Sequence, residues 1–301
     1  MEINGVKIRD THCEAFEAPF SRLVITGRSG KWASEAANLA VGCATSVIGC
    51  GCEAGMEART PAFTTPDARP GNAVLLFART TETLGRELVK RAGQTLLPAP
   101  TVSVFNGLDA GEDFELGVKV GFFGNGFQRE ERRHGRDCVS VPITSGEFLI
   151  EKRVKIGRGV GGANFWIFAA SQKAGLRAAE RAAESAGEMP GLILPFAGGV
   201  VAAASRVGSK YPFLAASTQE DYSPGVPEAK NPGRKLPKGV EAVFEIVIDA
   251  TTLEIAKNAL VAGIRAACAS GGVVEIGAAN FDGKLGDINI PLREILPGGA
   301  T

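Results

Sequence analysis

Histidine and clustered cysteine are scarce in this chain. Two histidines, His12 and His134, occur in 301 residues, and the six cysteines are scattered along the sequence. The one close cysteine pair is Cys50 and Cys52. Structural zinc sites need His and Cys ligands at short, regular spacings, so no such site can be assembled from the local sequence. We therefore expect no metal cofactor, and we expect reduced, structural cysteines that suit a reducing cytosol.

An excess of charge and long apolar runs are also missing. The 33 basic residues balance the 33 acidic ones, which gives no reason to expect nucleic acid or a membrane surface as a partner. The longest uncharged apolar run, residues 191–205, contains Pro195 and is shorter than the ~20 residues that span a bilayer. The N-terminus is charged from Glu2 onward and lacks the layout of a signal peptide. These features predict a cytoplasmic protein.

Familiar nucleotide-binding and hydrolase motifs are absent too. The glycines of residues 157–165 lead into a strand, whereas a dinucleotide-binding loop leaves a strand and opens a helix. The sequence has no Walker A run and no Gly-x-Ser-x-Gly elbow. It therefore gives no reason to expect a nucleotide cofactor or serine-hydrolase chemistry.

What the chain does have is one pattern repeated four times, a short apolar strand, an alanine-rich helix and a second strand. The four units, each written as strand, helix and strand, are expected at residues 21–27, 31–41 and 45–50; at 72–78, 82–92 and 101–106; at 163–170, 172–187 and 191–196; and at 242–250, 251–272 and 273–278. Two such units make one ferredoxin-like split-βαβ sandwich. The sequence thus predicts an α+β fold of two ferredoxin-like lobes related by duplication.

The expected lobes divide the chain near its middle. The N-terminal ferredoxin-like lobe would comprise residues 1–148 and the C-terminal one residues 149–301. Two loop-rich segments, residues 122–136 and 222–239, lie between the repeated units. Both are long enough for functional loops rather than simple connections.

One carboxylate interrupts the apolar strand expected at residues 242–250, "AVFEIVIDA". Alternate side chains of a strand share a face, so Glu245 shares its face with Val243, Val247 and Asp249. Such an acid faces solvent, pairs with a Lys or Arg from elsewhere, or lies buried with a raised pKa. From the strand alone the first two alternatives are favoured, because buried ionisable groups are rare without a partner.

Several longer motifs resemble one family from end to end of the chain. They are "MEINGVKIRDT" followed by "EAF", "SGEF", "GGANFWI", "LPFAGGVVAAASRVGSKYPFLAAST" and "FEIVID". Together they are similar to formylmethanofuran:tetrahydromethanopterin formyltransferase. The resemblance implies an enzyme of two ferredoxin-like lobes that moves a formyl group between the amine of a furan-containing carrier and N5 of a tetrahydropterin. It implies neither a metal nor a redox cofactor.

The resemblance also implies partners. Archaeal members of the family are homotetramers and often strongly acidic, whereas this chain is neutral. Neutrality fits better with the related D-type subunit of the formyltransferase/hydrolase complex of methylotrophic bacteria, whose carrier is methylofuran. We expect a cytoplasmic enzyme of one-carbon metabolism, either a homo-oligomer or a subunit of such a complex. Its cosubstrates would be methanofuran or methylofuran and tetrahydromethanopterin.

By this resemblance Glu245 matches the acid proposed for the family. Formyl transfer between two amines passes through a tetrahedral intermediate with a negatively charged oxygen. A carboxylic acid that an apolar site keeps neutral can donate a hydrogen bond to that oxygen. Glu245 should then be shielded from solvent, border a cleft and lack a close Lys or Arg.

Other residues of the matching motifs are candidates for substrate binding. These are Glu147, Asn164, Phe196, Gly198, Gly199, Ser205, Ser209 and Lys210. Glycine turns let a ligand approach the backbone, and Phe196 could stack on a ring, although sheet turns and core packing also explain such residues. Basic residues of the 122–136 segment could attract the polyglutamyl tail of the furan coenzyme, although a solvated charged loop is the plainer interpretation. These are Arg129, Arg132, Arg133 and Arg136.

Two other classes of function stay open at this point. The chain could be a catalytically inert scaffold or carrier-docking subunit of a multi-subunit complex, or a regulatory protein that only binds a small molecule. Both would bind a pterin or a similar molecule without transferring formyl. The presence of Glu245 argues against the inert scaffold.

Overall fold

The computed structural model describes residues 1–204 and 206–296 of the chain. They form an α+β fold with a large mixed sheet and six α-helices among the described residues, which confirms the α+β part of the prediction. The chain divides into two compact units. The terminal unit comprises Met1–Glu17 and Val160–Thr301, and the internal unit comprises Ala18–Gly159. The sequence predicts a single boundary after residue 148, whereas here the first 17 residues group with the C-terminal part of the chain.

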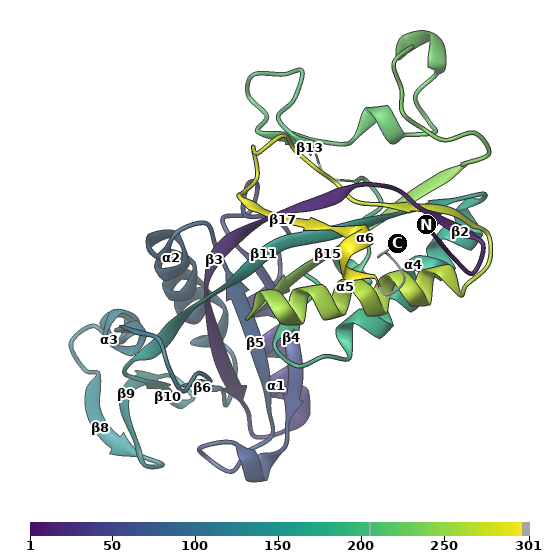
Figure 1. Ribbon diagram of the computed structural model, residues 1–301. Helices are drawn as coiled ribbons and strands as arrows, with labels where there is room; N and C mark the ends of the chain where they lie inside the picture. The colour runs from purple at the N-terminus through teal and green to yellow at the C-terminus, as the bar shows by residue number, and fades with distance from the viewer. Residues whose placement is uncertain (205, 297–301) are drawn as a thin grey trace. The chain divides into compact units, whose positions relative to one another are not determined.

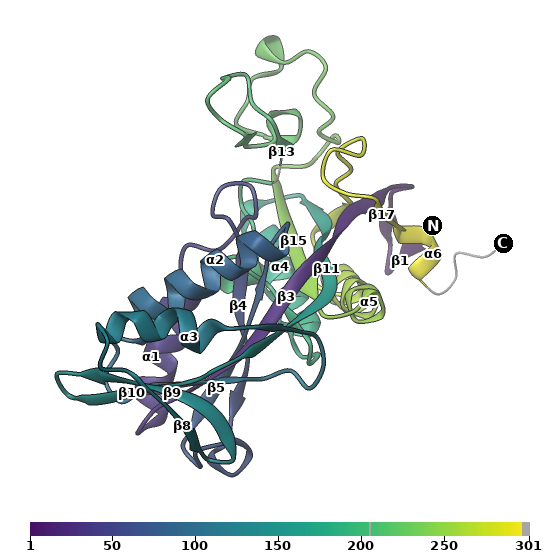
Figure 2. The same cartoon turned by 90° about the vertical axis from the view of Figure 1, so that its left-hand side faces the viewer.

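The internal unit begins with two strand–helix–strand passages. Their elements are β3 (His12–Thr26), α1 (Gly30–Val41), β4 (Glu53–Thr60), β5 (Gly71–Phe77), α2 (Thr81–Arg91), a π-helical turn (Ala92–Leu96) and β6 (Ser103–Asn106). The part of β3 before Ala18 belongs to the terminal unit. The strands lie in the order β4–β5–β3–β6, and every neighbouring pair is antiparallel. Apolar side chains of α1 and α2 pack on one face of these strands. Figure 2 shows both helices on that face.

A second group of elements extends this sheet beyond β6. It comprises β7 (Glu112–Phe114), α3 (Leu116–Gly121), a 3-10 turn (Phe122–Gly124), β8 (Arg129–Arg133), β9 (Arg136–Ile143) and β10 (Gly146–Glu151). β10 pairs parallel to β6, and β9 and β8 follow as antiparallel neighbours. The segment 122–136, expected as a loop, therefore contains a strand of a β-hairpin.

The terminal unit repeats the strand–helix–strand plan. Its elements are β11 (Val154–Ala169), α4 (Gln172–Gly187), β12 (Leu192–Ile193), β15 (Ala242–Ala250), α5 (Leu253–Cys268) and β16 (Val273–Gly277). The strands lie in the order β12–β15–β11–β16, again with antiparallel neighbours. α4 and α5 pack side by side on one face of this sheet, as Figure 1 shows.

Shorter elements complete the terminal unit. They are β1 (Glu2–Ile3), β2 (Val6–Ile8), β13 (Arg206–Val207), β14 (Ala216–Ser217), β17 (Ile288–Pro291) and α6 (Leu292–Ile295). β2 pairs parallel to β16, and β17 pairs antiparallel to the start of β3. Residues 222–239, expected as a loop, are irregular apart from the end of one 3-10 turn (Glu220–Tyr222) and the whole of another (Glu228–Lys230).

One expected strand is wrong. Residues 45–50 form a turn in which Cys50 N–H donates to Ser46 O at 2.8 Å and the Ser46 hydroxyl accepts from Ile48 N–H at 3.2 Å. A serine side chain that bonds neighbouring backbone N–H groups competes with strand pairing. The strand comes later instead, as β4, and the expected strand at residues 191–196 shrinks to the two residues of β12.

Candidate active site

The centre of β15 carries a completely buried carboxyl group. Phe244, Ile246 and Ile248 point to the face that α4 and α5 cover, and they belong to the main core of the terminal unit. Glu245 points to the opposite face, yet its exposed fraction is 0%. The prediction that Glu245 is shielded is therefore confirmed. The predictions of a bordering cleft and of no close Lys or Arg stay predictions.

Backbone pairing fixes Glu245 on both sides. It lies directly opposite Trp166 of β11, and on its other side it exchanges two hydrogen bonds with Val201, at 2.8 and 2.9 Å. Directly opposed residues of an antiparallel pair share a face, so the Glu245 and Trp166 side chains project together. The strand neighbours on this face are Val243 and Val247, so the surroundings of the acid along the strand are apolar.

The Trp166 ring belongs to a small aromatic cluster on the same face. It packs edge-on against Tyr222 and Phe168, with ring centroids 4.7 and 6.1 Å away. The guanidinium of Arg9 lies 4.8 Å from the centroid of the Phe168 ring, within cation–π range. Tyr222 ends the 3-10 turn Glu220–Tyr222, so this cluster fastens that turn to the sheet beside β15.

Asn164 and Asp249 form a second buried polar group on β11 and β15. Asp249 Oδ1 accepts from Gly162 N–H at 2.8 Å, where φ is +76° and β11 has a bulge. Asn164 Nδ2 donates to Gly162 O at 3.1 Å, and its Oδ1 accepts from Ala279 N–H at 2.8 Å. Asn164, predicted as a substrate contact, thus holds two backbone segments in place. Asp249 was noted only as a strand neighbour of Glu245.

Glu14 is a buried acid whose role the sequence does not reveal. It lies on β3 with an exposed fraction of 0%, and its carboxylate accepts from four backbone N–H groups of the loop after β16. Those of Phe281, Gly283 and Gly286 lie 2.8, 3.0 and 2.9 Å away, and that of Leu285 also donates. Burial raises the pKa of Glu14, but these four donors lower it more, so its pKa lies below the ordinary range.

The loop lies very close to β3 at Gly286. A Cβ atom there would come within 2.4 Å of Ala15 O, so only glycine fits. Glu14 belongs to the motif "EAF". Its position among apolar residues of a strand is the one feature of the sequence that could have identified it as a buried acid. Glu14 and Asn164 together fix the 278–286 loop from two sides.

The glycine-rich stretch after β12 has mixed roles. Gly198 and Gly199 both adopt positive φ, at +61° and +75°. A Cβ atom on Gly199 would come within 2.7 Å of Leu194, whereas one on Gly198 would meet open space. Phe196, which precedes them, is half-buried. Gly199 is therefore required by packing, and Gly198 is the one that offers accessible backbone.

The remaining candidates of this stretch lie further along the chain. Ser209 Oγ accepts from Tyr211 N–H at 3.0 Å, which stabilises a turn. Lys210 is exposed, and Ser205 lies outside the described residues.

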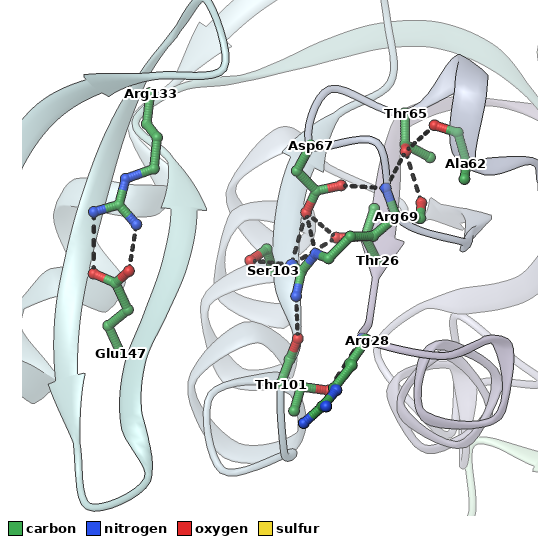
Figure 3. A network of polar contacts seen from close by, with 10 residues as sticks. All are labelled: Thr26, Arg28, Ala62, Thr65, Asp67, Arg69, Thr101, Ser103, Arg133 and Glu147. Atoms are coloured by element: carbon green, nitrogen blue, oxygen red, sulfur yellow. Dashed lines mark hydrogen bonds and ion pairs between the residues drawn. The ribbon is translucent and has the colours of Figure 1, made fainter.

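Glu147, also a predicted substrate contact, belongs to the internal unit. It lies on β10, where the Arg133 guanidinium binds both of its oxygens and the Ser140 hydroxyl donates to one of them at 2.7 Å. The Arg133 and Ser140 hydrogen bonds hold the pKa of Glu147 below its usual range. The pair, which Figure 3 shows, links β8 to β10, the two strands on either side of β9. This arrangement braces the hairpin.

The four predicted tail-binding arginines divide into two kinds. Arg133 pairs with Glu147 and Glu131, and Arg136 pairs with Glu151 at 3.1 Å. Arg129 and Arg132 form no ion pair with any of the described residues. These two are therefore the more available for an anionic ligand.

A polar network lies on the same side of the internal unit. The Arg69 guanidinium donates to Asp67 at 2.7 Å, to Thr101 O at 2.7 Å and to Ser103 Oγ at 2.6 Å. Figure 3 shows this network, which also includes Thr26. A cavity of about 250 Å³ lies between Arg69 and Glu147 and has both among its lining residues. Every donor nitrogen of Arg69 is bound, so the network is structural.

Within the part of the chain that the structure describes, no group of three or more His, Cys, Asp or Glu side chains is placed to hold a metal ion. No helix of the described residues is long and apolar enough to cross a membrane.

Comparisons with known proteins give the family. Residues 1–143 match the family model "Formylmethanofuran-tetrahydromethanopterin formyltransferase", and residues 146–295 match "FTR, proximal lobe". The formyltransferase of Methanopyrus kandleri is 45% identical over 98% of this chain and its own whole length. That of Methylococcus capsulatus is 44% identical over the same shares.

Solved structures agree. The Methanosarcina barkeri formyltransferase, 43% identical, covers 98% of this chain and its own whole length with a TM-score of 0.88. A chain of the formyltransferase/hydrolase complex from Methylorubrum extorquens, solved with methylofuran, is 37% identical and covers 98% of both chains with a TM-score of 0.90.

The fold and these matches define a transferase. The chain belongs to the formylmethanofuran–tetrahydromethanopterin formyltransferase family. The family predicted from the sequence motifs is thereby confirmed.

Proposed function

We propose that the chain transfers a formyl group between the amine of a furan carrier and N5 of tetrahydromethanopterin, and that Glu245 stabilises the intermediate. The substrates follow from the names of relatives that are 41–45% identical over almost the whole chain. The observation that carries the role of Glu245 is its complete burial on β15, opposite Trp166 and between two valines.

The proposed reaction needs no external reagent. The amine of the acceptor attacks the formyl carbon of the donor, a new C–N bond forms, and the carbonyl oxygen becomes an oxyanion. When the intermediate collapses, the old C–N bond breaks, the leaving amine takes a proton and the attacking amine loses one. The same steps run in either direction.

Glu245 would act in its neutral form. An apolar, buried site favours a neutral carboxylic acid, which can donate its proton in a hydrogen bond to the oxyanion. A preorganised donor of this kind contributes about 2.7–4 kcal/mol to the transition state. Because the oxyanion forms only during the reaction, the effect should fall on kcat rather than on substrate binding.

Two variants of Glu245 test this role. In a purified transfer assay that follows the absorbance of the pterin, Glu245→Ala should lower kcat about 100- to 1,000-fold. Glu245→Gln retains an N–H donor and should keep more activity than Glu245→Ala. A Glu245→Ala enzyme with the activity of the wild type would contradict the role, and the wild-type rate itself tests the proposed reaction.

Other predicted site residues are assigned to substrate binding. We propose that Gly198, Phe196 and Lys210 contact substrate, and that Arg129 and Arg132 attract an anionic tail of the furan carrier. Double replacement of Arg129 and Arg132 by Ala should raise KM for a long-tailed carrier at low salt and leave kcat unchanged. An unchanged KM would remove the tail contact.

The furan carrier is methanofuran or methylofuran. The related complex from Methylorubrum extorquens was solved with methylofuran, which supports the second choice. The same relative supports a role as one subunit of a formyltransferase/hydrolase complex, with a homo-oligomer as the alternative. Assays with both carriers decide the substrate, and light scattering of the purified chain decides whether it self-associates. The alternative of an inert scaffold subunit is not favoured by any described feature.

We also infer that the two units arose by duplication of a ferredoxin-like lobe. Both have two strand–helix–strand passages, and in both the four strands lie in the same order relative to the chain. That order is the one expected for a split-βαβ sandwich. The boundary expected after residue 148 would separate these two sets of elements.

A further inference from the structure

A cavity of about 420 Å³ lies in the internal unit at the start of α1. Its side chains come from the first turn of α1 and from facing ends of β4 and β5. Two are basic, Lys31 and Arg59, and none of the lining residues is acidic. Neither cation forms an ion pair with any described residue. The electrostatics of the cavity therefore favour an anion.

Strand register places the floor of the cavity under the helix. Arg59 and Asn72 lie directly opposite each other in the β4–β5 pair, so their side chains share a face. Val74 and Leu76, which alternate with Asn72 along β5, pack in the same core as the buried alanines of α1. The helix-covered face of the sheet thus ends in Arg59 and Asn72. Figure 1 shows α1 beside β4 and β5.

The helix adds unsatisfied donors at this point. Ser29 caps α1, accepting from Trp32 N–H with its hydroxyl at 3.5 Å and from Ala33 N–H with its carbonyl at 3.1 Å. The N–H groups of Gly30 and Lys31 precede the first intrahelical donors, and the first turn has no acidic residue. The start of a 12-residue helix with such free donors attracts anions.

A buried side chain supplies an independent sign of a ligand. Asn72 is 1% exposed, and its Nδ2 donates to Ser34 Oγ at 3.3 Å. Its Oδ1, like Thr60 Oγ1, has no hydrogen-bond partner among the described residues. A buried acceptor without a partner is unfavourable. With the amide turned over, Oδ1 accepts from the Ser34 hydroxyl and Nδ2 donates into the cavity.

We propose that this cavity binds a small phosphorylated molecule, with the phosphate at the start of α1. Lys31 and Arg59 supply the charge, and the first N–H groups of α1, the Asn72 amide and the Thr60 hydroxyl supply hydrogen bonds. The volume lies in the range of small-molecule sites, about 300–1,000 Å³, so the ligand is larger than phosphate alone. The site uses none of the residues assigned to formyl transfer and is independent of that reaction.

Calorimetric titration of the whole chain tests the site with three probes, inorganic phosphate, glycerol 3-phosphate and glycerol, at constant ionic strength. Both phosphates should bind and glycerol should not. Lys31→Ala and Arg59→Ala should each weaken phosphate binding about tenfold or more, because hydrogen bonds to charged groups contribute about 1.5–3 kcal/mol. Arg86→Ala, which removes an exposed cation from α2, is the matched control and should bind like the wild type.

The variant Asn72→Asp tests whether the side-chain amide of Asn72 donates a hydrogen bond to the phosphate. It keeps the shape of the side chain but turns a donor into a carboxylate, so it should abolish phosphate binding while circular dichroism stays native. The proposal is overturned if neither phosphate binds the wild type, or if Lys31→Ala, Arg59→Ala and Asn72→Asp all bind phosphate as the wild type does.

Discussion

Two fully buried acids of the terminal unit are held differently from several acids of the internal unit, although arginine pairs such as Arg9–Glu275 also occur in the terminal unit. In the terminal unit, Glu14 and Asp249 are fully buried, and backbone N–H groups of glycine-containing turns donate to them. In the internal unit, several acids are paired with arginine. These pairs are Arg22–Glu57, Arg69–Asp67, Arg133–Glu147 and Arg136–Glu151.

The difference separates two uses of a carboxylate. The exposed Arg133–Glu147 pair joins β8 to β10, and solvent shares in stabilising it. An acid bound by backbone N–H groups in a dry site fixes the path of a loop, because each donor belongs to the chain itself. Glu245 is as fully buried as these acids, and it lies on the same face of β15 as Asp249 and opposite Trp166. Chemistry is therefore expected in the terminal unit and bracing in the internal unit.

The largest expected effect concerns Glu14. Glu14→Ala leaves four backbone N–H groups of the 280–286 loop without their acceptor, and we expect it to lower the free energy of unfolding by about 3–5 kcal/mol. Denaturant unfolding followed by circular dichroism measures this loss. A loss below about 1 kcal/mol would show that the backbone-held acids are no more important than the surface pairs.

The pH dependence of stability also tests the contribution of the ionised Glu14 carboxylate. The pKa of Glu14 is lowered in the folded protein, so its contribution is fully present above the unfolded pKa of about 4.3 and is lost as the pH falls through the lower folded value. The stability difference between wild type and Glu14→Gln should thus be constant above about pH 5 and shrink below about pH 4. Urea unfolding across this range measures it, and a difference that grows with acidification would reverse the assigned sign.

The smallest expected effect is that of Glu147→Ala. The Arg133–Glu147 pair is about 40% exposed on the Glu147 side, so its removal should cost less than about 1 kcal/mol and less still at high salt. Arg133→Ala is the partner control. If Glu147→Ala lowers kcat as strongly as Glu245→Ala, Glu147 takes part in the reaction and the division of roles between the units fails.

The sequence reveals most of the helices and strands but few of their interactions. Alternation in "AVFEIVIDA" places Glu245 on the face away from the helices, and the strand covers the predicted residues. The composition of residues 45–50 predicts a strand. It does not show that the Ser46 side chain accepts hydrogen bonds from neighbouring backbone N–H groups and so forms a turn.

Contacts between distant parts of the chain are harder to predict. Glu14 and the loop that it holds are about 270 positions apart, and no local pattern records which backbone N–H groups will meet a carboxylate. Asn164 was selected as a substrate contact for its motif, yet its hydrogen bonds go to Gly162 and Ala279. A polar side chain in a buried strand indicates a constraint, and only the fold shows which one.

The protonation state of Glu245 tests the central claim most directly. Infrared difference spectra between the wild type and Glu245→Gln, recorded at neutral pH in water and in deuterium oxide, isolate the vibrations of this one carboxyl group. We predict that the wild type shows the carbonyl band of a neutral carboxylic acid, shifted by deuterium, and that Glu147→Gln removes only ionised-carboxylate bands. Ionised-carboxylate bands alone at Glu245 would contradict a neutral hydrogen-bond donor at the centre of β15.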